Sequence, residues 1–199
     1  MPTQQRRRVS HQFIIGCMLL LMLVLTRSGI TRSHFGTEFN LPDASWAVFW
    51  MMGLFTTLAA WPMLLLVACV SVDYFVIAGG VSSYCVTPAY AFLLPAYLSL
   101  WAFGRWSRSQ LPLRAASLPL LASSIVVGVT TCFVITNLSF YFMSGYFADM
   151  PLMEFAHRVV RYWPYYLLHT AIYAGVGLLI HYCVVHLQRH NAMRSDTTS

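Results

Sequence analysis

The residues that could do chemistry gather in a few short stretches of an otherwise apolar sequence. Carboxylates, imidazoles and thiols bind metals and polar ligand groups. The stretch 32–43 contains His34, the stretch 79–88 contains Cys85, and Asp73 stands alone inside an apolar run. A further stretch, 149–161, holds Asp149, Glu154, His157, Arg158 and Arg161. These groups are the candidates for a binding site, and each also has a structural interpretation.

Cys85 has the most reactive setting of the five cysteines. It lies in a loop rich in glycine and serine, just before Pro88, where a helix is predicted to begin. The dipole of a helix N-terminus favours the thiolate, and a thiolate is a soft ligand for polarisable metal centres. The alternative is an ordinary loop cysteine.

Asp73 and His34 each have two interpretations. Asp73 comes eleven residues into an apolar segment that begins at Pro62, where a carboxylate is costly and marks a candidate functional site. It could equally be a hydrogen-bonded acid that ties two helices together. His34 lies in a predicted aqueous loop, where a single histidine is more often solvated than liganding.

The segment from Pro151 to Trp163 predicts an amphipathic helix. At helical spacing its apolar residues form one face and its polar residues form a stripe on the opposite face. The apolar face consists of Leu152, Phe155, Val159 and Trp163, and the stripe of Glu154, His157, Arg158 and Arg161. Because Glu154 and Arg158 are four residues apart, they could simply pair with each other.

The composition indicates what kind of protein carries these residues. Of the 199 residues 58% are hydrophobic and only 9% are charged, against about 25% in soluble domains. This excludes a disordered chain and argues against a soluble enzyme. The twelve bases are all arginines and form no single patch, which argues against nucleic acid as a partner. With no lysine the chain has no phosphate-binding loop, so an ATPase is excluded.

The apolar runs predict an all-α membrane protein that crosses the bilayer six times. Residues 1–12 and 188–199 are the predicted tails, and residues 13–187 a single transmembrane domain without a separate soluble domain. Pro95 is expected to kink the fourth segment, and residues 60–62 to form a short turn between the second and third. The six segments are 13–29, 43–60, 62–79, 87–104, 112–137 and 162–187.

The arginines predict the orientation. With the N-terminus inside, eight arginines lie at inner positions and four at outer ones, which favours both termini in the cytoplasm. His34, Asp73, Cys85 and the stretch 149–161 then all lie toward the outer face. The first segment also resembles a signal peptide, although no typical cleavage site follows it.

Small residues at four-residue spacing predict where helices pack closely, because they let backbones approach in lipid. They occur in the fifth segment at Ser124, Gly128 and Cys132, and in the sixth as the pairs Thr170/Ala174 and Ala171/Gly175.

Several short stretches of the sequence resemble a known family. The sequence resembles the BtuM family of bacterial membrane proteins, proposed cobalamin (vitamin B12) transporters related to the S-components of energy-coupling-factor importers. The similar strings are Ser33-His34-Phe35-Gly36 with Leu41-Pro42-Asp43-Ala44-Ser45-Trp46, Val72-Asp73-Tyr74, and Tyr84-Cys85-Val86-Thr87-Pro88-Ala89-Tyr90. Arg158 fits the family less sharply, with Arg161 as its alternative.

The resemblance implies a fold, a ligand and a site. The fold would be a six-helix bundle of the S-component type in the bacterial inner membrane, with its site open to the periplasm. Cys85 would coordinate the cobalt of cobalamin, and His34, Asp73, Tyr90 and Arg158 would line the pocket. The same thiolate is associated in the family with removal of cyanide from cyanocobalamin. Cobinamide is the alternative cargo.

The first segment departs from S-components that share a transmembrane partner. Those carry an Ala-x-x-x-Ala surface on their first helix, whereas residues 16–22 here read Gly-Cys-Met-Leu-Leu-Leu-Met. The resemblance therefore implies a solitary protein without a dedicated ATPase partner. Two other functions stay open, a membrane-embedded thiol enzyme that modifies corrinoids and an assembly subunit of a larger membrane complex.

Overall fold

The computed structural model describes residues 2–28, 42–84, 86–111 and 113–197, with side chains between residues 10 and 188. Helices dominate these residues, and no strand occurs among them. The predicted all-α class is therefore confirmed.

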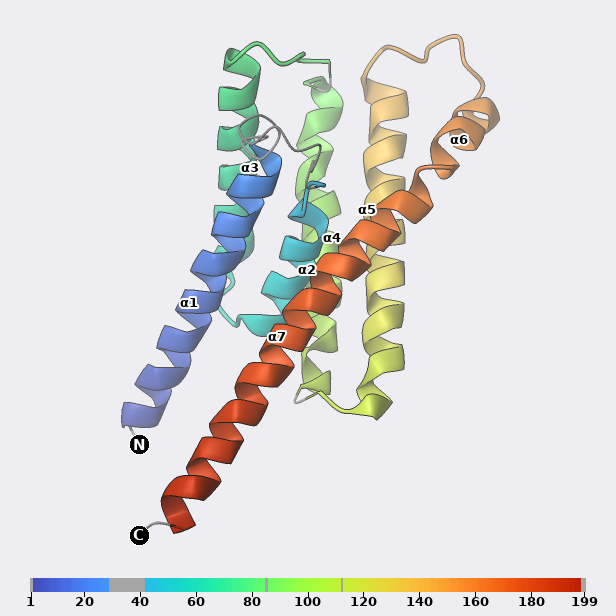
Figure 1. Ribbon diagram of the computed structural model, residues 1–199. Helices are drawn as coiled ribbons and strands as arrows, with labels where there is room; N and C mark the ends of the chain where they lie inside the picture. Colours follow the sequence, from blue (N-terminus) through green and yellow to red (C-terminus); the bar gives the residue numbers. More distant parts are fainter. Residues whose placement is uncertain (1, 29–41, 85, 112, 198–199) are drawn as a thin grey trace, which may run out of the picture.

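The helices form one elongated bundle (Figure 1). Three short 3-10 helices flank α4 and α5 in the chain. They are η2 (Pro88–Phe92) before α4, η3 (Ser107–Gln110) after α4, and η4 (Ala115–Ser117) before α5. The α-helices are α1 (Pro2–Arg27), α2 (Ser45–Phe55), α3 (Ala60–Ala78), α4 (Leu93–Trp106), α5 (Leu118–Met143), α6 (Leu152–Val160) and α7 (Trp163–Thr197).

Four of the described helical segments are long and apolar enough to cross a membrane: Ser10–Arg27, Ala60–Ala78, Ala115–Met143 and Trp163–Gln188. They correspond to the first, third, fifth and sixth predicted segments. The second and fourth correspond to α2 and α4, which are helices but are shorter than a span. The 11 residues of α2 rise only about 17 Å, against a hydrocarbon core of roughly 30 Å.

Several predicted boundaries were wrong. The turn between α2 and α3 comprises residues 56–59 rather than 60–62, because α2 ends at Phe55. Pro95 lies in the first turn of α4, after the 3-10 helix η2, so it occupies a helix start instead of kinking a helix interior. The fifth segment runs from Leu118 to Met143, with Pro119 in its first turn, instead of 112–137. Within the two predicted tails, residues 2–12 and 188–197 are helical parts of α1 and α7.

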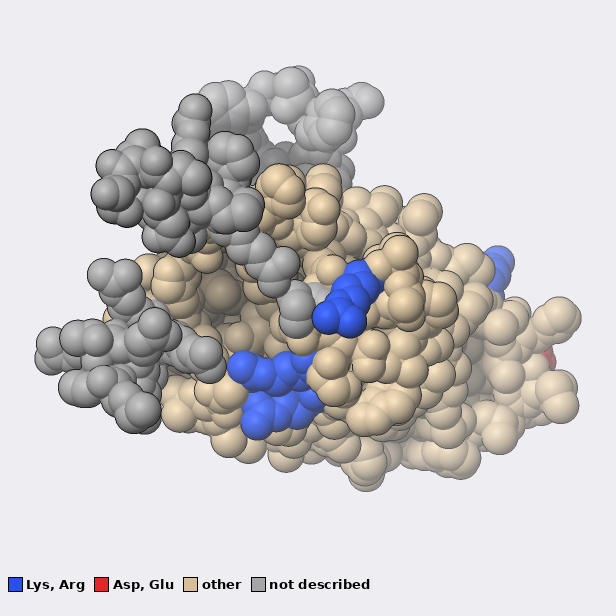
Figure 2. All heavy atoms as spheres, turned by 90° about the horizontal axis from the view of Figure 1, so that it is seen from below, with Lys and Arg blue, Asp and Glu red and all other residues tan. Residues whose placement is uncertain are grey.

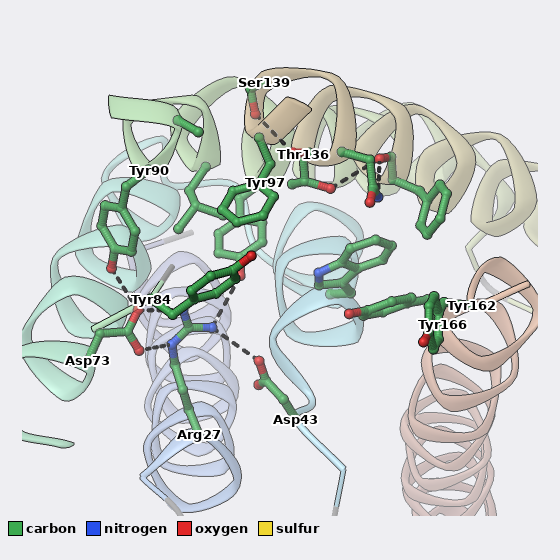
Figure 3. A pocket seen from close by; sticks show the side chains of 16 residues that line it. Arg27, Asp43, Asp73, Tyr84, Tyr90, Tyr97, Thr136, Ser139, Tyr162 and Tyr166 are labelled. Carbon is green, nitrogen blue, oxygen red and sulfur yellow. Dashed lines mark hydrogen bonds and ion pairs between the residues drawn. The ribbon is translucent and has the colours of Figure 1, made fainter. Parts of the chain in front are cut away.

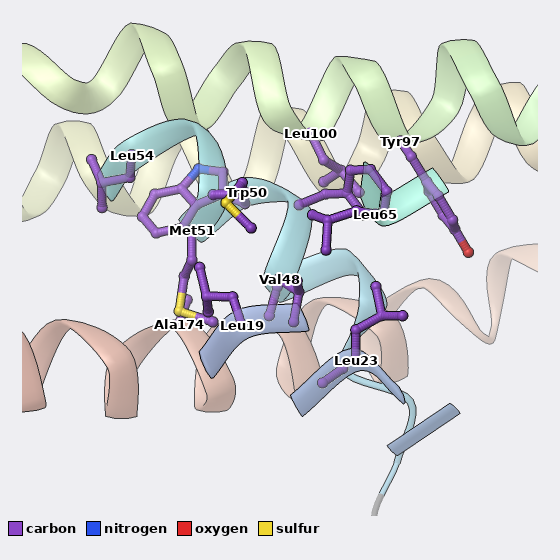
Figure 4. Packing of buried hydrophobic residues seen from close by; sticks show 14 of the residues in the cluster. Leu19, Leu23, Val48, Trp50, Met51, Leu54, Leu65, Tyr97, Leu100 and Ala174 are labelled. Carbon is purple, nitrogen blue, oxygen red and sulfur yellow. The ribbon is translucent and has the colours of Figure 1, made fainter. Parts of the chain in front are cut away.

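The short helix α2 forms the centre of the bundle. It is buried along almost its whole length, and it contacts α1, α3, α4, α5 and α7. Trp50 and Met51 are among its fully buried side chains (Figure 4). Trp50 also donates a hydrogen bond from Nε1 to Ser124 Oγ on α5, at 3.2 Å. A helix that is apolar all round is expected to be enclosed by others, as this one is.

Two glycines allow α2 and α4 to cross in backbone contact. A Cβ atom on Gly104 of α4 would stand 1.9 Å from the carbonyl oxygen of Trp50, and one on Gly53 of α2 would stand 2.1 Å from that of Trp101. No real side chain fits at such distances, so this crossing requires glycine on both helices.

The small residues of the fifth segment face a packing surface, as predicted. Ser124, Gly128 and Cys132 are all buried on α5. On α7 the two predicted pairs differ, because Thr170 and Ala174 are buried whereas Ala171 and Gly175 are exposed. Only the first pair therefore belongs to a helix contact within this chain.

Helix α1 begins and helix α7 ends at the same end of the bundle, which we call the terminal end (Figure 1). The connection from α4 to α5 lies there too. The connections from α3 to η2 and from α5 to α6 lie at the opposite end, which we call the loop end. Arg27, at the end of α1, and Asp73, in the last third of α3, are therefore near the loop end.

Candidate functional site

A cavity of about 520 Å³ lies between the helices at the loop end (Figure 3). Its volume is within the range of roughly 300–1,000 Å³ typical of small-molecule sites. Charged groups line one side, and hydroxyl, amide and aromatic side chains line the rest. The lining residues are Arg27, Asp43, Trp46, Asp73, Tyr84, Ala89, Tyr90, Leu93, Tyr97, Phe133, Thr136, Asn137, Ser139, Phe140, Tyr162 and Tyr166.

Arg27 is the centre of the polar side of the cavity. Its side chain is only 12% exposed. Nε and Nη2 donate to the two carboxylate oxygens of Asp73, at 2.6 and 2.7 Å, which is the bidentate geometry of a strong ion pair. Nη1 donates to Asp43 Oδ2, Ser45 Oγ and Tyr97 Oη, each at 3.1 Å. One guanidinium group thus joins α1 to α3, to the start of α2 and to α4.

Asp73 has a third donor besides the two nitrogens of Arg27. The hydroxyl of Tyr90, on η2, donates to Asp73 Oδ2 at 2.6 Å. These three hydrogen bonds, two of them from a cation, offset the cost of taking the carboxylate out of water. The resemblance assigns both residues to the pocket, and in the structure they meet at its wall.

Asp43 is held at the start of α2 by short-range contacts. Its Oδ1 accepts hydrogen bonds from the backbone N–H of Ser45 at 2.9 Å and from Ser45 Oγ at 2.6 Å. A carboxylate is also favoured by the dipole at a helix N-terminus. Two further bonds fix this segment, since Ala44 N–H donates to Thr26 Oγ1 and Tyr173 Oη donates to the carbonyl of Pro42.

Stacked aromatic pairs form other parts of the cavity wall. Tyr84 lies parallel to Tyr146 of the α5–α6 connection, with ring centroids 4.4 Å apart. Trp46 of α2 stacks on Tyr166 of α7 at 4.6 Å. Such pairs hold the rings in place, so the cavity offers flat apolar surfaces beside the charged cluster of Arg27, Asp73 and Asp43.

The amphipathic helix predicted from 151–163 is present as α6. Phe155 is buried, and the polar stripe is exposed. Arg158, 59% exposed, donates to Glu154 Oε1 at 2.6 Å, which confirms the pairing considered from the sequence. Neither Arg158 nor its alternative Arg161 is among the residues that line the cavity. Arg158 is exposed on α6, so a place for it in the ligand pocket stays a prediction.

His34 and Cys85, two of the five predicted site residues, lie outside the described residues. Tyr84, which precedes Cys85 in the chain, and Ala89, four residues after it, both line the cavity. The other four cysteines lie in α1, α3, α5 and α7, as their apolar surroundings predicted.

Sequence reasoning missed Arg27 as a site residue. The count of charges treated it only as one of the outer arginines that indicate orientation. A signal was present, since Arg27 ends an apolar segment at the same depth as the single intramembrane acid Asp73. Two opposite charges at one depth of a helix bundle are expected to pair.

We expect Tyr90→Phe to lower the free energy of unfolding by about 1.5 kcal/mol. This is the lower part of the range for a hydrogen bond to a charged group, because Tyr90 is half-buried and water can replace part of the bond. Unfolding in detergent would measure the change, with Tyr182→Phe on the exposed side of α7 as the matched control. Equal stability of the Tyr90 variant and the control would contradict the assigned bond.

The arrangement is suited to binding. Among the described residues no three His, Cys, Asp or Glu side chains come together as a metal site requires. The cavity instead combines one cation, two carboxylates and several hydroxyls with flat aromatic walls. These groups can orient a large ligand that has an extended ring and hydrogen-bonding substituents.

Comparisons of the sequence with models of known protein families and with curated proteins found no match.

Proposed function

We propose that this protein binds cobalamin or a related corrinoid in the cavity at its loop end and takes part in corrinoid uptake across the bacterial inner membrane. One observation carries the proposal. Asp73 and Tyr90 belong to two separate sequence stretches that resemble the BtuM family. They are hydrogen-bonded to each other at the wall of a cavity of about 520 Å³. Tyr84, the neighbour of Cys85, lines that same cavity.

The character of the cavity supports a corrinoid ligand. A corrin is a broad ring with amide substituents around its edge, so it needs flat apolar surfaces and hydrogen-bonding groups at the same time. Stacked tyrosines and Trp46 supply the surfaces. Hydroxyls, Asn137 and the charged cluster supply hydrogen-bonding groups. We expect the ring to enter the cavity while the bulkier substituents remain at its open side.

Cys85 is the proposed ligand of the cobalt. The corrin nitrogens occupy four positions of the metal, so the protein needs to supply only one axial ligand. A thiolate suits this position because it is soft and strongly donating. With cyanocobalamin, the thiolate would take the place of cyanide on the same metal, and cyanide would leave as the anion.

In our proposal the loop end faces the periplasm and the terminal end faces the cytoplasm. The arginines of the α4–α5 connection lie at the terminal end, together with the helix ends that carry Arg6–Arg8 and Arg194. This distribution follows the rule that positive charges stay on the cytoplasmic side. The proposed bundle crosses the membrane six times, with α2 enclosed by its neighbours and α4 extended by η2. Short or irregular helices are tolerated in a membrane when protein surrounds them.

The proposal predicts that Cys85→Ser abolishes the cobalt–sulfur interaction. Wild-type protein purified from cells grown with corrinoid should carry a pigment whose absorption differs from that of the free compound. In Cys85→Ser the spectrum should revert to that of the free corrinoid, and the retained amount should fall at least tenfold. Cys183→Ser, which removes an exposed thiol from α7, is the matched control and should behave as wild type.

The same experiment separates the alternatives. An unchanged spectrum in Cys85→Ser would refute cobalt coordination by this residue. Cyanide release in a single turnover without uptake by cells would favour the thiol enzyme. Colourless wild-type protein that purifies with stoichiometric partner proteins would favour the assembly subunit.

A further inference from the structure

Three arginines belong to the segment that connects α4 to α5 at the terminal end. Arg105 is in the last turn of α4, Arg108 is in η3, and Arg114 immediately precedes η4. We call them the arginine patch. Arginines gather on this end face, as the view from below shows (Figure 2). The acids with described side chains all belong to segments at the loop end: Asp43, Asp73, Asp149 and Glu154.

The first arginine of the patch has a structural partner. Arg105 Nη1 donates to the carbonyl oxygen of Thr56, the C-cap of α2, at 3.0 Å. A cation is favoured at a helix C-terminus, so this bond strengthens the contact between α2 and α4. Part of the charge of Arg105 therefore serves the fold.

Arg108 lacks such a partner. The residue is half-buried, and its Nη1 is enclosed without a hydrogen-bond acceptor among the described residues. A buried donor without an acceptor is costly. Burial and the nearby charge of Arg105 also lower the pKa of Arg108. An anion beside this guanidinium group would offset the repulsion between the two arginines.

The patch lies at the boundary between water and lipid. Trp106, between the two arginines of α4 and η3, is 58% exposed, and Leu118, at the start of α5, is exposed as well. The apolar segment that contains α5 begins at Ala115. Tryptophan and arginine at the end of a membrane-spanning segment are typical of the level of the lipid head groups. The anion available at the level of the head groups is a lipid phosphate.

We propose that the arginine patch is a binding site for the phosphate of an anionic phospholipid in the leaflet at the terminal end. Arg108 and Arg114 bind the phosphate, Arg105 contributes charge, and the acyl chains lie beside Trp106 and Leu118. Arginine suits this role because its planar group donates two parallel hydrogen bonds to a phosphate. The site is independent of the corrinoid cavity at the other end of the molecule.

The test compares the thermal unfolding of the purified chain in detergent with added phosphatidylglycerol or phosphatidylcholine. We expect phosphatidylglycerol to raise the Tm in a saturable manner and phosphatidylcholine to have little effect, because only the lipid with a net negative charge neutralises the patch. Arg108→Gln and Arg114→Gln should each weaken the apparent affinity for phosphatidylglycerol about tenfold, which corresponds to roughly 1.4 kcal/mol.

Matched variants make the outcome clear. Arg158→Gln removes an exposed arginine at the loop end and should keep the full response. If Arg108→Gln fails to fold, the pair Arg114→Gln and Arg114→Lys still decides the question, since the lysine variant should retain most of the affinity. Equal responses to both lipids, or an unchanged response in the patch variants, would overturn the site. If soluble glycerol phosphate gave the same rise in Tm, the site would bind free phosphate and the lipid assignment would be wrong.

Discussion

Replacing Arg27 by methionine should destabilise the protein by about 3 kcal/mol and abolish the binding of corrinoid that we propose. Loss of one partner of a buried ion pair leaves the other charge uncompensated, which typically costs roughly 3–5 kcal/mol. We expect the lower figure because the side chain of Asp73 is 22% exposed and water can solvate part of its charge. Methionine replaces the aliphatic part of the arginine side chain and is a good helix former, so α1 itself should not be disturbed.

The double variant Arg27→Met/Asp73→Leu separates stability from binding. A buried ion pair replaced by apolar residues of similar size often leaves stability unchanged or improved. The double variant should therefore recover at least half of the stability lost by Arg27→Met. Corrinoid binding should stay absent, because the carboxylate at the cavity wall is gone.

Unfolding in detergent measures the first quantity, and absorption of the purified protein measures the second. Arg161→Met, which removes an exposed arginine from the loop end, is the control for loss of one positive charge. If Arg27→Met were as stable as the control and still bound corrinoid, the central role of Arg27 would be refuted.

The second large effect is expected where α2 and α4 cross. In Gly104→Ala the new methyl group would overlap the carbonyl oxygen of Trp50, which is backbone and cannot move aside as a side chain does. Overpacking in a core usually costs roughly 1–3 kcal/mol. Here we expect about 3 kcal/mol or more, because the two helices must separate and the bond from Trp50 to Ser124 stretches with them.

Gly175→Ala is the matched control for this prediction. A Cβ atom on Gly175 meets nothing within 4 Å, so the alanine should be neutral or slightly stabilising. Thermal unfolding of both variants in the same detergent gives the comparison. Equal melting temperatures would show that the crossing is looser than the structure indicates.

The two effects concern one structural unit. The crossing of α2 and α4 positions Ser45 at one end of α2 and Tyr97 of α4, and both accept hydrogen bonds from Arg27. Arg27 in turn holds Asp73, which receives the hydroxyl of Tyr90. A change at the crossing should therefore also reach the cavity, so Gly104→Ala should weaken the proposed binding of corrinoid even in the fraction that remains folded.

The sequence alone determined the class of the protein and the position of most helices. A composition with 9% charged residues indicates a membrane protein, and each apolar run corresponds to a helix. The reason is that a chain in a bilayer must satisfy its backbone hydrogen bonds locally. The sequence also predicted the amphipathic pattern of α6 and the pairing of Glu154 with Arg158, because both depend on residues close together in one helix.

Only the tertiary structure decided which polar residues meet. Arg27 and Asp73 are 46 positions apart, and Arg27 and Tyr97 are 70 apart, so no local pattern relates them. The same is true of Gly53 and Gly104, whose shared contact makes α2 the buried centre of the bundle instead of an ordinary span. Local hydrogen bonding and hydropathy depend on neighbours in the chain, whereas an ion pair or a helix crossing depends on how whole helices are arranged in space.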